Sequence, residues 1–296
     1  MSPRILVRDI LAATFRFLPH FRGKQTLGVV LAKLLTDYQR GEECLVTFSM
    51  GDGTIMRMDL RTTTAAWSFW TGRYDHRVIE HLSSYLRPGA AVLDVGAHIG
   101  FYSIPLARRL KDLGGTLFAF EPIVSNSQAL QENVALNGLE SVVHVFNVAL
   151  GNEEGEICLH FRDFGVAPTG NAVIVTGRVG ESFPPNATAR ITTLDALAST
   201  LDIRSCSLIK LDIEGYEHEF VKGAITFIER TRPVIYGEFS PYWMQLQREE
   251  TVGAAHDLLK NLGYRAFIWT KKKGFIVPRG SDLEGGNILF VPADRD

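Results

Sequence analysis

The sequence predicts a doubly wound α/β fold with a mostly parallel sheet of seven strands, an N-terminal helical and hairpin extension, and a β-rich insertion. Three observations support this prediction. Short apolar runs alternate with helical patterns beyond residue 90, and these runs contain few polar residues, as is typical of strands covered on both faces. A glycine-containing turn joins the first run to a helix. The 296 residues, 46% of them hydrophobic, suffice to bury a core of this size.

The N-terminal part of the chain does not share this alternation. Residues 1–40 have a helical pattern that is interrupted near Pro19 and Gly23. Residues 44–60 predict a β-hairpin, because Asp52-Gly53 lies between two apolar-rich runs. We therefore expect helices and then a hairpin before the sheet begins.

The α/β pattern begins with a predicted helix at about 75–86, which ends where Pro88 and Gly89 follow. The predicted strands of the sheet are 91–95, 116–120, 142–146, 208–212, 234–238, 264–269 and 287–291. The predicted helices between them are 102–110, 125–136, 193–198, 217–230 and 251–262. The last two strands are expected to form an antiparallel pair.

The alternation breaks over residues 151–193, where Gly, Pro, Asn and Thr accompany short β-like pieces at 156–161 and 172–175. We interpret this segment as an insertion of strands and loops at the edge of the sheet or over its cleft. The chain is therefore expected to divide into an N-terminal segment, residues 1–70, and a domain over residues 71–296 that contains the insertion.

Composition and charge argue against several classes of function. The net charge of −2 gives no positive field for phosphates, so no nucleic-acid partner is expected. The three cysteines are far apart and include no Cys-x-x-Cys pair, which argues against a disulfide framework or a zinc cluster. These features fit a cytoplasmic protein.

Basic and apolar residues are interleaved over residues 1–24. The basic ones are Arg4, Arg8, Arg16, Arg22 and Lys24. One interpretation is an amphipathic helix on a membrane surface, which would make the protein membrane-associated. The other is a helix that packs against the body of the protein or against the second subunit of a homodimer. No apolar run approaches the length of a transmembrane span.

The turn after the first predicted strand has the features of a ligand site. Asp94 lies in the strand, and Gly96, Ala97 and Gly100 follow it. A sharp strand-to-helix turn favours glycine, because a Cβ would clash or block a ligand, and the helix start offers free N–H groups. The Gly-x-x-x-Gly spacing differs from that of dinucleotide sites, and a carboxylate at Asp94 suits an ammonium or sulfonium better than a pyrophosphate. The alternative is an ordinary turn of an unrelated α/β protein.

A second acidic residue ends the next predicted strand, where Glu121 is followed by Pro122. Ligands of open α/β sheets bind at the carboxyl ends of the strands, and an acid at this position can accept both hydroxyls of a ribose. The alternative interpretation is a glutamate on the surface. The glycine turn makes the ribose role the favoured one.

Four segments of the sequence form a recognisable set, at residues 94–100, 120–122, 210–217 and 233–238. Together they resemble the FkbM family of class I S-adenosylmethionine-dependent methyltransferases, over about residues 71 to 292. The most specific element is the Lys-x-Asp-x-Glu-Gly-x-Glu block that begins at residue 210. The sequence departs from the family pattern at two positions: Asp75 replaces the glutamate of a Gly-x-Tyr-Glu motif, and His98 replaces an asparagine.

This resemblance implies a class I methyltransferase fold and S-adenosylmethionine as the cofactor. Gly96 and Gly100 would border the methionine moiety, Glu121 would hold the ribose, and residues 147–149 would flank the adenine. The residues predicted to bind the cofactor are Tyr74, Asp94, Gly96, Ala97, Gly100, Glu121, Pro122, Asn147, Ala149 and Asp212.

The predicted catalytic residues are Asp212, Glu238 and Lys210. Lys210 and Asp212 are two positions apart along a strand and should point the same way, and Glu238 ends the next strand. Methyl transfer requires an aligned acceptor oxygen and a group that takes up its proton. Asp212 is the first candidate for this base and Glu238 the second, while Lys210 would fix a carboxylate or lower the pKa of the acceptor hydroxyl. For all four residues, Lys210, Asp212, Glu217 and Glu238, the alternative is a structural ion-pair cluster that holds the strand ends and the turn at Gly215 together.

The same acids offer a second role as metal ligands. Asp212, Glu214 and Glu238 would supply oxygen atoms to Mg²⁺ or Ca²⁺, which would also bind a substrate oxygen. The ligand set is incomplete without substrate or water, so a site without metal is the first expectation.

The predicted function is the O-methylation of a hydroxyl on a small-molecule acceptor. The resemblance implies a sugar, a glycolipid or a secondary metabolite. Tyr242 and Trp243, in the loop after Glu238, are candidates for facing such an acceptor. The alternatives are a noncatalytic binding module with this fold and a nicotinamide-dependent oxidoreductase, against which the missing third glycine argues.

Overall fold

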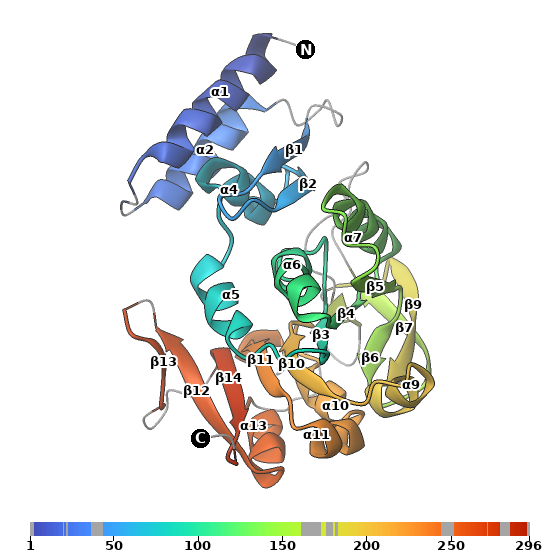
Figure 1. Cartoon of the computed structure of the whole chain (residues 1–296). Coiled ribbons are helices and arrows are strands. Elements are labelled where there is room, and N and C mark those ends of the chain that lie inside the picture. The colour runs from blue at the N-terminus through green and yellow to red at the C-terminus, as the bar shows by residue number, and fades with distance from the viewer. Residues whose placement is uncertain are drawn as a thin grey trace.

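The computed structural model contains a central sheet with helices on both faces and an N-terminal group of elements at one end (Figure 1). It describes residues 3–19, 21, 23–36, 44–160, 173–175, 180, 183–243, 252–270, 272–278 and 285–294.

The central sheet confirms the predicted fold. In spatial order, its strands are β13 (Gly274–Ile276), β12 (Tyr264–Thr270), β14 (Gly286–Pro292), β11 (Val234–Phe239), β10 (Cys206–Leu211), β3 (Ala91–Val95), β4 (Thr116–Phe120) and β5 (Val143–Phe146). The five strands from β11 to β5 are parallel, whereas β14 is antiparallel to both of its neighbours. The seven predicted strands are all present with ends within two residues of the prediction. The short edge strand β13, which pairs with β12, was not predicted.

Helices cover both faces of the sheet, so the fold is doubly wound. One face packs against α5 (His76–Ser83), α6 (Ser103–Leu113) and α7 (Val124–Leu136). The other packs against α9 (Leu194–Thr200), α10 (Glu217–Lys222), α11 (Ile225–Thr231) and α13 (Val252–Asn261). Neighbouring strand residues alternate between the two cores, as Val92 and Leu93 do.

One predicted helix, 217–230, is instead two helices, α10 and α11. Gly223 lies between them against the backbone of Gly151, and a Cβ at Gly223 would collide with the Gly151 carbonyl oxygen. This close approach of two chain segments requires glycine and coincides with the break between the helices.

The N-terminal part contains the predicted helices and hairpin and one further helix. Its elements are α1 (Pro3–Phe17), α2 (Lys24–Leu35), β1 (Leu45–Ser49), β2 (Ile55–Asp59) and α4 (Thr63–Thr71). Helix α4 was not predicted, and it runs across the boundary expected after residue 70. Figure 1 shows α1 and α2 side by side, with α4 between them and the rest of the molecule.

Three basic side chains of α1 and α2 turn toward the protein, whereas Arg4 and Lys33 are exposed. The Arg16 guanidinium lies 4.4 Å from the centre of the Phe48 ring, and its Nε donates to the carbonyl of Phe69 at 2.8 Å. Arg8 is 2% exposed, and Lys24 is 5% exposed with its ammonium bonded to the carbonyl of Leu18. These contacts favour the interpretation of helices packed on the body. No helix among the described residues is long and apolar enough to cross a membrane.

Ten apolar side chains of these helices and of the link between them point outward. They are Leu6, Val7, Ile10, Leu11, Phe17, Leu18, Phe21, Leu27, Val30 and Leu34, each between 42% and 91% exposed. Arg22 lies outside the described residues. Membrane contact through residues 1–24 and a homodimer both stay predictions.

The insertion forms a second sheet. Its order is β6 (Ala149–Gly151), β9 (Ala187–Thr193), β7 (Gly155–His160) and β8 (Val173–Ile174). The predicted pieces correspond to β7 and β8, although their end residues Phe161 and Ala172 lie outside the described residues, and β9 was not predicted. Leu159 and Ile174 of this sheet line a cavity beside the end of β4, so the insertion lies over the cleft.

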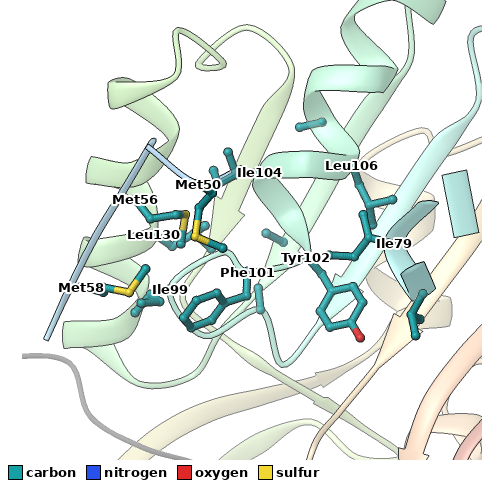
Figure 2. Packing of buried hydrophobic residues seen from close by; sticks show 14 of the residues in the cluster. Met50, Met56, Met58, Ile79, Ile99, Phe101, Tyr102, Ile104, Leu106 and Leu130 are labelled. Atoms are coloured by element: carbon teal, nitrogen blue, oxygen red, sulfur yellow. The ribbon is translucent and has the colours of Figure 1, made fainter. Parts of the chain in front are cut away.

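The hairpin β1–β2 packs directly against the glycine turn. Figure 2 shows Met56 and Met58 of β2 grouped with Ile99 and Phe101 of the turn and Leu130 of α7. Because these side chains are 7% exposed or less, the N-terminal part and the turn share one core.

Candidate active site

The turn between β3 and α6 places backbone atoms at the carboxyl edge of the sheet. Gly96 has a φ of 77°, in the left-handed region that favours glycine, and a Cβ there would collide with the carbonyl oxygen of Asp212. The amides of Gly96 and Ala97 both donate to the carbonyl of Phe120, at 2.9 and 3.0 Å. The turn therefore holds the ends of β3, β4 and β10 together.

Glu121, at the end of β4, is buried and held by three donors. Its Oε2 accepts from the amide of His98 at 2.8 Å, while Oε1 accepts from the amide of Ile123 at 3.0 Å and the side chain of Asn126 at 3.3 Å. Burial raises the pKa of Glu121 to about 7, and these hydrogen bonds offset part of that effect. The carboxyl group is thus oriented and titrates near neutral pH.

A cavity of about 640 Å³, here named the first cavity, opens beside Glu121. Its polar lining includes Glu121 and Asn126, and the Oδ1 of Asn126 is buried without a hydrogen-bond partner. Its apolar lining includes Leu150, Leu159 and Ile174. A few oriented polar groups in a mostly apolar cavity are typical of a site for a small molecule.

A second cavity of about 470 Å³ also borders the glycine turn. Lys210 and Asp212 line it from the sheet, whereas Thr62 and Thr64 line it from the start of α4. The two cavities adjoin, because both are lined by Gly96, His98 and Asp212.

Lys210 is held between two aspartates at the floor of the second cavity. Its ammonium donates to the carbonyl of Gly96 at 2.8 Å and lies 3.3 Å from Asp94 and 3.7 Å from Asp212. Asp94 is fully buried and also accepts a bond of 2.6 Å from the hydroxyl of Ser103. Although burial opposes the charge, the two carboxylates raise the pKa of Lys210, so it remains an ammonium group.

Further carboxyl groups surround Asp212. Asp75 accepts a bond of 2.9 Å from the hydroxyl of Tyr102, and the hydroxyl of Tyr236 lies 3.4 Å from that of Tyr102. Burial raises the pKa values of Asp75 and Glu238, and the charge of Asp212 raises both further. The mouth of the sheet is therefore acidic and contains proton acceptors beside the second cavity.

Residues 94–266 match the model of the Methyltransferase FkbM domain. The matched region includes the glycine turn, Glu121, the block from Lys210 to Glu217, and β11, and it spans more than half of the chain. The chain belongs to the FkbM methyltransferase family. The family resemblance predicted from the sequence is thereby confirmed.

Among solved structures, the chain is similar to methyltransferase FkbM from Methylobacillus flagellatus KT, at 17% identity and a TM-score of 0.41. That match covers 97% of this chain and 58% of the Methylobacillus chain, so this chain spans little more than half the length of that protein. No curated protein matches the chain significantly.

Two further structures share low identity with the chain. An S-adenosylmethionine-dependent O-methyltransferase from Thermotoga maritima has 13% identity and a TM-score of 0.39, covering 76% of this chain and 68% of its own. Precorrin-6y C5,15-methyltransferase from Geobacter metallireducens GS-15 has 14% identity and a TM-score of 0.38, covering 72% and 86% respectively. The family assignment rests on the match of residues 94–266 to the family model.

Most of the predicted site residues of this FkbM domain line the two cavities. The glycine turn lines both cavities. The end of β4 lines the first cavity, whereas β10 and the segment before α5 line the second cavity. The predicted residues found there are Gly96 and Asp212 in both cavities, Glu121, Pro122 and Ala149 in the first, and Tyr74, Ala97 and Lys210 in the second.

Other predicted residues support the site from outside. Asp94 is covered by Lys210 and Ser103 and lines neither cavity. Gly100 lies against Leu130, where a Cβ would approach within 2.6 Å of the leucine side chain. Asn147 donates to the carbonyls of Glu121 and Pro122, at 2.8 and 2.9 Å, and so fixes the end of β4. Glu238 lines neither cavity and lies close enough to Asp212 for the two charges to interact.

The FkbM site also contains residues that the sequence did not predict. They include Asn126, Leu159 and Ile174 in the first cavity, and Thr62 and Thr64 in the second. The alternation of Ile157 and Leu159 with polar residues could have indicated an inward face of the insertion. No sequence pattern indicates the other residues, because only the packing of their helices and strands places them beside the cavities.

The metal-binding role of Asp212, Glu214 and Glu238 stays a prediction. Among the residues that the structure describes, no group of three His, Cys, Asp or Glu side chains is arranged to hold a metal ion. Glu214 lines the first cavity, whereas Glu238 lines neither cavity and interacts electrostatically with Asp212 and Asp75. Glu217 has a structural role, since it accepts bonds from the amides of Ile213 and Gly215 in the turn after β10.

Proposed function

We propose that the chain binds S-adenosylmethionine across the two cavities and transfers its methyl group to a hydroxyl of a small-molecule acceptor. The observation that carries this proposal is the buried Glu121, oriented by three donors at the edge of an apolar cavity and next to the glycine turn. Membership of the FkbM family supports it and argues against a nicotinamide-dependent oxidoreductase.

The first cavity fits the nucleoside part of this cofactor. Glu121 has three of its roughly four acceptor positions engaged, which leaves one for a ribose hydroxyl. The unpartnered Oδ1 of Asn126 is an acceptor for the second hydroxyl. Leu150, Leu159 and Ile174 provide apolar contacts for a flat base.

Asp212 is the residue best placed to act on the acceptor. When bound, S-adenosylmethionine supplies an electrophilic methyl group on a sulfonium. Asp212 lines both cavities, and its side chain is 32% exposed, so it can orient an acceptor hydroxyl and take up its proton. Lys210 positions Asp212 and Asp94 instead of contacting the acceptor, because Asp94, Asp212 and the Gly96 carbonyl already surround its ammonium.

The acceptor class follows from the family resemblance. We propose a hydroxyl of a sugar, a glycolipid or a secondary metabolite. An aromatic cluster just beyond β11 supports this class of acceptor, because aromatic rings can pack against such a molecule. The ring centres of Tyr242 and Trp243 lie 5.0 Å apart, and those of Trp243 and Phe183 of the insertion lie 5.5 Å apart. Residues 71–296 would form the methyltransferase domain, with residues 1–70 as its N-terminal segment.

Calorimetry and labelled-methyl transfer together test the proposal. We expect S-adenosylmethionine and S-adenosylhomocysteine to bind, and Glu121→Ala to weaken both by about 1–3 kcal/mol, the scale of buried charge-assisted hydrogen bonds. A panel of sugar nucleotides, glycolipids and macrolides with isotopically labelled cofactor should reveal the acceptor. Asp212→Asn should remove transfer while leaving cofactor binding measurable.

The noncatalytic binding module remains the competing function. It predicts ligand binding that needs no cofactor and is unchanged in Asp212→Asn. Absence of binding to S-adenosylmethionine and S-adenosylhomocysteine by the wild-type protein would disprove the methyltransferase proposal.

A further inference from the structure

The second cavity has walls of opposite electrostatic character. On the sheet side, Lys210 is balanced by Asp94, which leaves Asp212 as the negative group facing the space. On the opposite side, Thr62 and Thr64 belong to the start of α4, a helix of nine residues. A helix start has positive character, since its aligned peptide dipoles and free N–H groups point outward.

The first turn of α4 has free donors. Thr62 is the N-cap, and its hydroxyl accepts from the amide of Ala65 at 3.2 Å, while its carbonyl accepts from Ala66. No described residue accepts a hydrogen bond from the amides of Thr63 and Thr64. The hydroxyl of Thr64 also has no described partner, and this residue faces the cavity. Such a helix start is suited to an anionic group.

His98 supplies an independent indication of a ligand. This residue lines both cavities, and its Nε2 is buried with no hydrogen-bond partner among the described residues. Burial, followed by the charge of Lys210, lowers the pKa of His98 to about 4, so the ring is neutral at pH 7. A neutral imidazole with its proton on Nε2 is a single donor, and a buried donor without an acceptor is costly.

We propose that the start of α4 and the Nε2 of His98 bind the α-carboxylate of the cofactor's methionine moiety. This inference rests on the proposed function, because it requires the nucleoside part to lie in the first cavity. The amino acid end is a zwitterion, and the second cavity offers the matching arrangement: Asp212 for the ammonium, and the helix start with His98 for the carboxylate. The N-terminal segment is thereby part of the cofactor site.

Removing the carboxylate from the ligand tests this assignment directly. Calorimetry would compare S-adenosylmethionine with decarboxylated S-adenosylmethionine, which keeps the sulfonium and the amine. We expect the wild-type protein to bind the complete cofactor at least about tenfold more tightly, the scale of one or two charge-assisted hydrogen bonds.

Variants of the two donors should remove this difference. His98→Ala and Thr64→Val should each weaken S-adenosylmethionine by about fivefold to twentyfold and leave the decarboxylated ligand unchanged. Thr63→Val is the matched control, because Thr63 is exposed on the same helical turn and does not line the cavity. It should bind both ligands as the wild type does. Thr64→Val also serves as the second variant if His98→Ala does not fold.

The outcomes separate this inference from the function on which it rests. Equal affinity of the wild type for the two ligands, or variants that weaken both ligands alike, would overturn the carboxylate assignment alone. Binding of neither ligand by the wild type would overturn the proposed function and this assignment with it.

Discussion

Glu121 combines two properties that couple ligand binding to pH. It is buried with a pKa near 7, and it must be ionised to accept a ribose hydroxyl with its remaining lone pair. Because binding favours the ionised form, affinity should rise with pH as the group loses its proton. For a pKa of about 7, we expect affinity for S-adenosylhomocysteine to increase about tenfold between pH 6 and pH 8.

Calorimetry at several pH values measures this effect. Glu121→Gln is the matched variant, since it preserves shape and cannot titrate. It should bind more weakly and show a flat profile between pH 6 and pH 8. The variant is needed because burial also raises the pKa of Glu217 to about 7, and Glu217 titrates in the same range. A wild-type profile that is also flat would contradict the role of Glu121.

Gly96 illustrates a residue whose absent side chain matters. Gly96→Ala would place a Cβ against the carbonyl oxygen of Asp212 at a φ of 77°. We expect the free energy of unfolding in urea to fall by at least about 2 kcal/mol. Gly89→Ala is the control, because Gly89 has a φ of 69° but nothing within 4 Å of the added Cβ. It should cost only about 1 kcal/mol, and equal losses would show that the contact with Asp212 is unimportant.

The sequence was informative for residues whose role depends on strand ends. Gly96, Glu121 and Asp212 were predicted because the carboxyl ends of parallel strands meet at one edge. Asp94 was expected beside an ammonium or sulfonium, and the ammonium that it meets is that of Lys210. The role of Asn126 was not predicted, because its Oδ1 is buried without a hydrogen-bond partner only as a result of how α7 packs.

Helix α7 links the N-terminal hairpin to the glycine turn through one asparagine. The side chain of Asn133 accepts from the amide of Arg57 at 2.7 Å and donates to the carbonyls of Arg57 and Ile99, at 3.2 and 2.9 Å. Asn133→Ala leaves these backbone groups without partners in the core. We expect a loss of about 2–4 kcal/mol in the free energy of unfolding.

The asparagine that caps the C-terminus of α7 provides the control. Asn137 makes equivalent bonds to the amide and carbonyl of Ile55, but they are exposed, so water can replace them. Asn137→Ala should cost about 1 kcal/mol or less. Similar losses for the two variants in chemical denaturation would argue against a buried link between the hairpin and the turn.

Element prediction succeeded where one periodicity dominates. The seven sheet strands are apolar runs bounded by turns, so their positions followed from the sequence. Helix α4 was missed because its residues Ala65, Ala66, Ser68, Phe69 and Trp70 are all buried, which removes the polar face that marks an amphipathic helix. The break between α10 and α11 depends on a distant segment, Gly151, and has no local signal beyond Gly223.

At the scale of the whole molecule, the outward apolar face of α1 and α2 bears on membrane contact. In a flotation assay, we expect the protein to bind vesicles of neutral phospholipid. The double variant Ile10→Ser and Phe17→Ser should reduce this binding, because both side chains are exposed. Added salt should have little effect, since Arg8, Arg16 and Lys24 turn inward.

If the same surface instead forms a homodimer, we expect a different result from light scattering and from the vesicle experiment. Light scattering would then show twice the mass of the chain, with the double variant reducing it to one chain and vesicles remaining unbound. A monomer that also fails to float would contradict both predictions for residues 1–24.

The second cavity has one wall outside the segment that defines the family. Thr62, Thr64 and Tyr74 precede residue 94, where the family match begins. The segment that defines the family therefore does not by itself enclose the second cavity. A comparison of this cavity between family members has to include the stretch from residue 62 to residue 75.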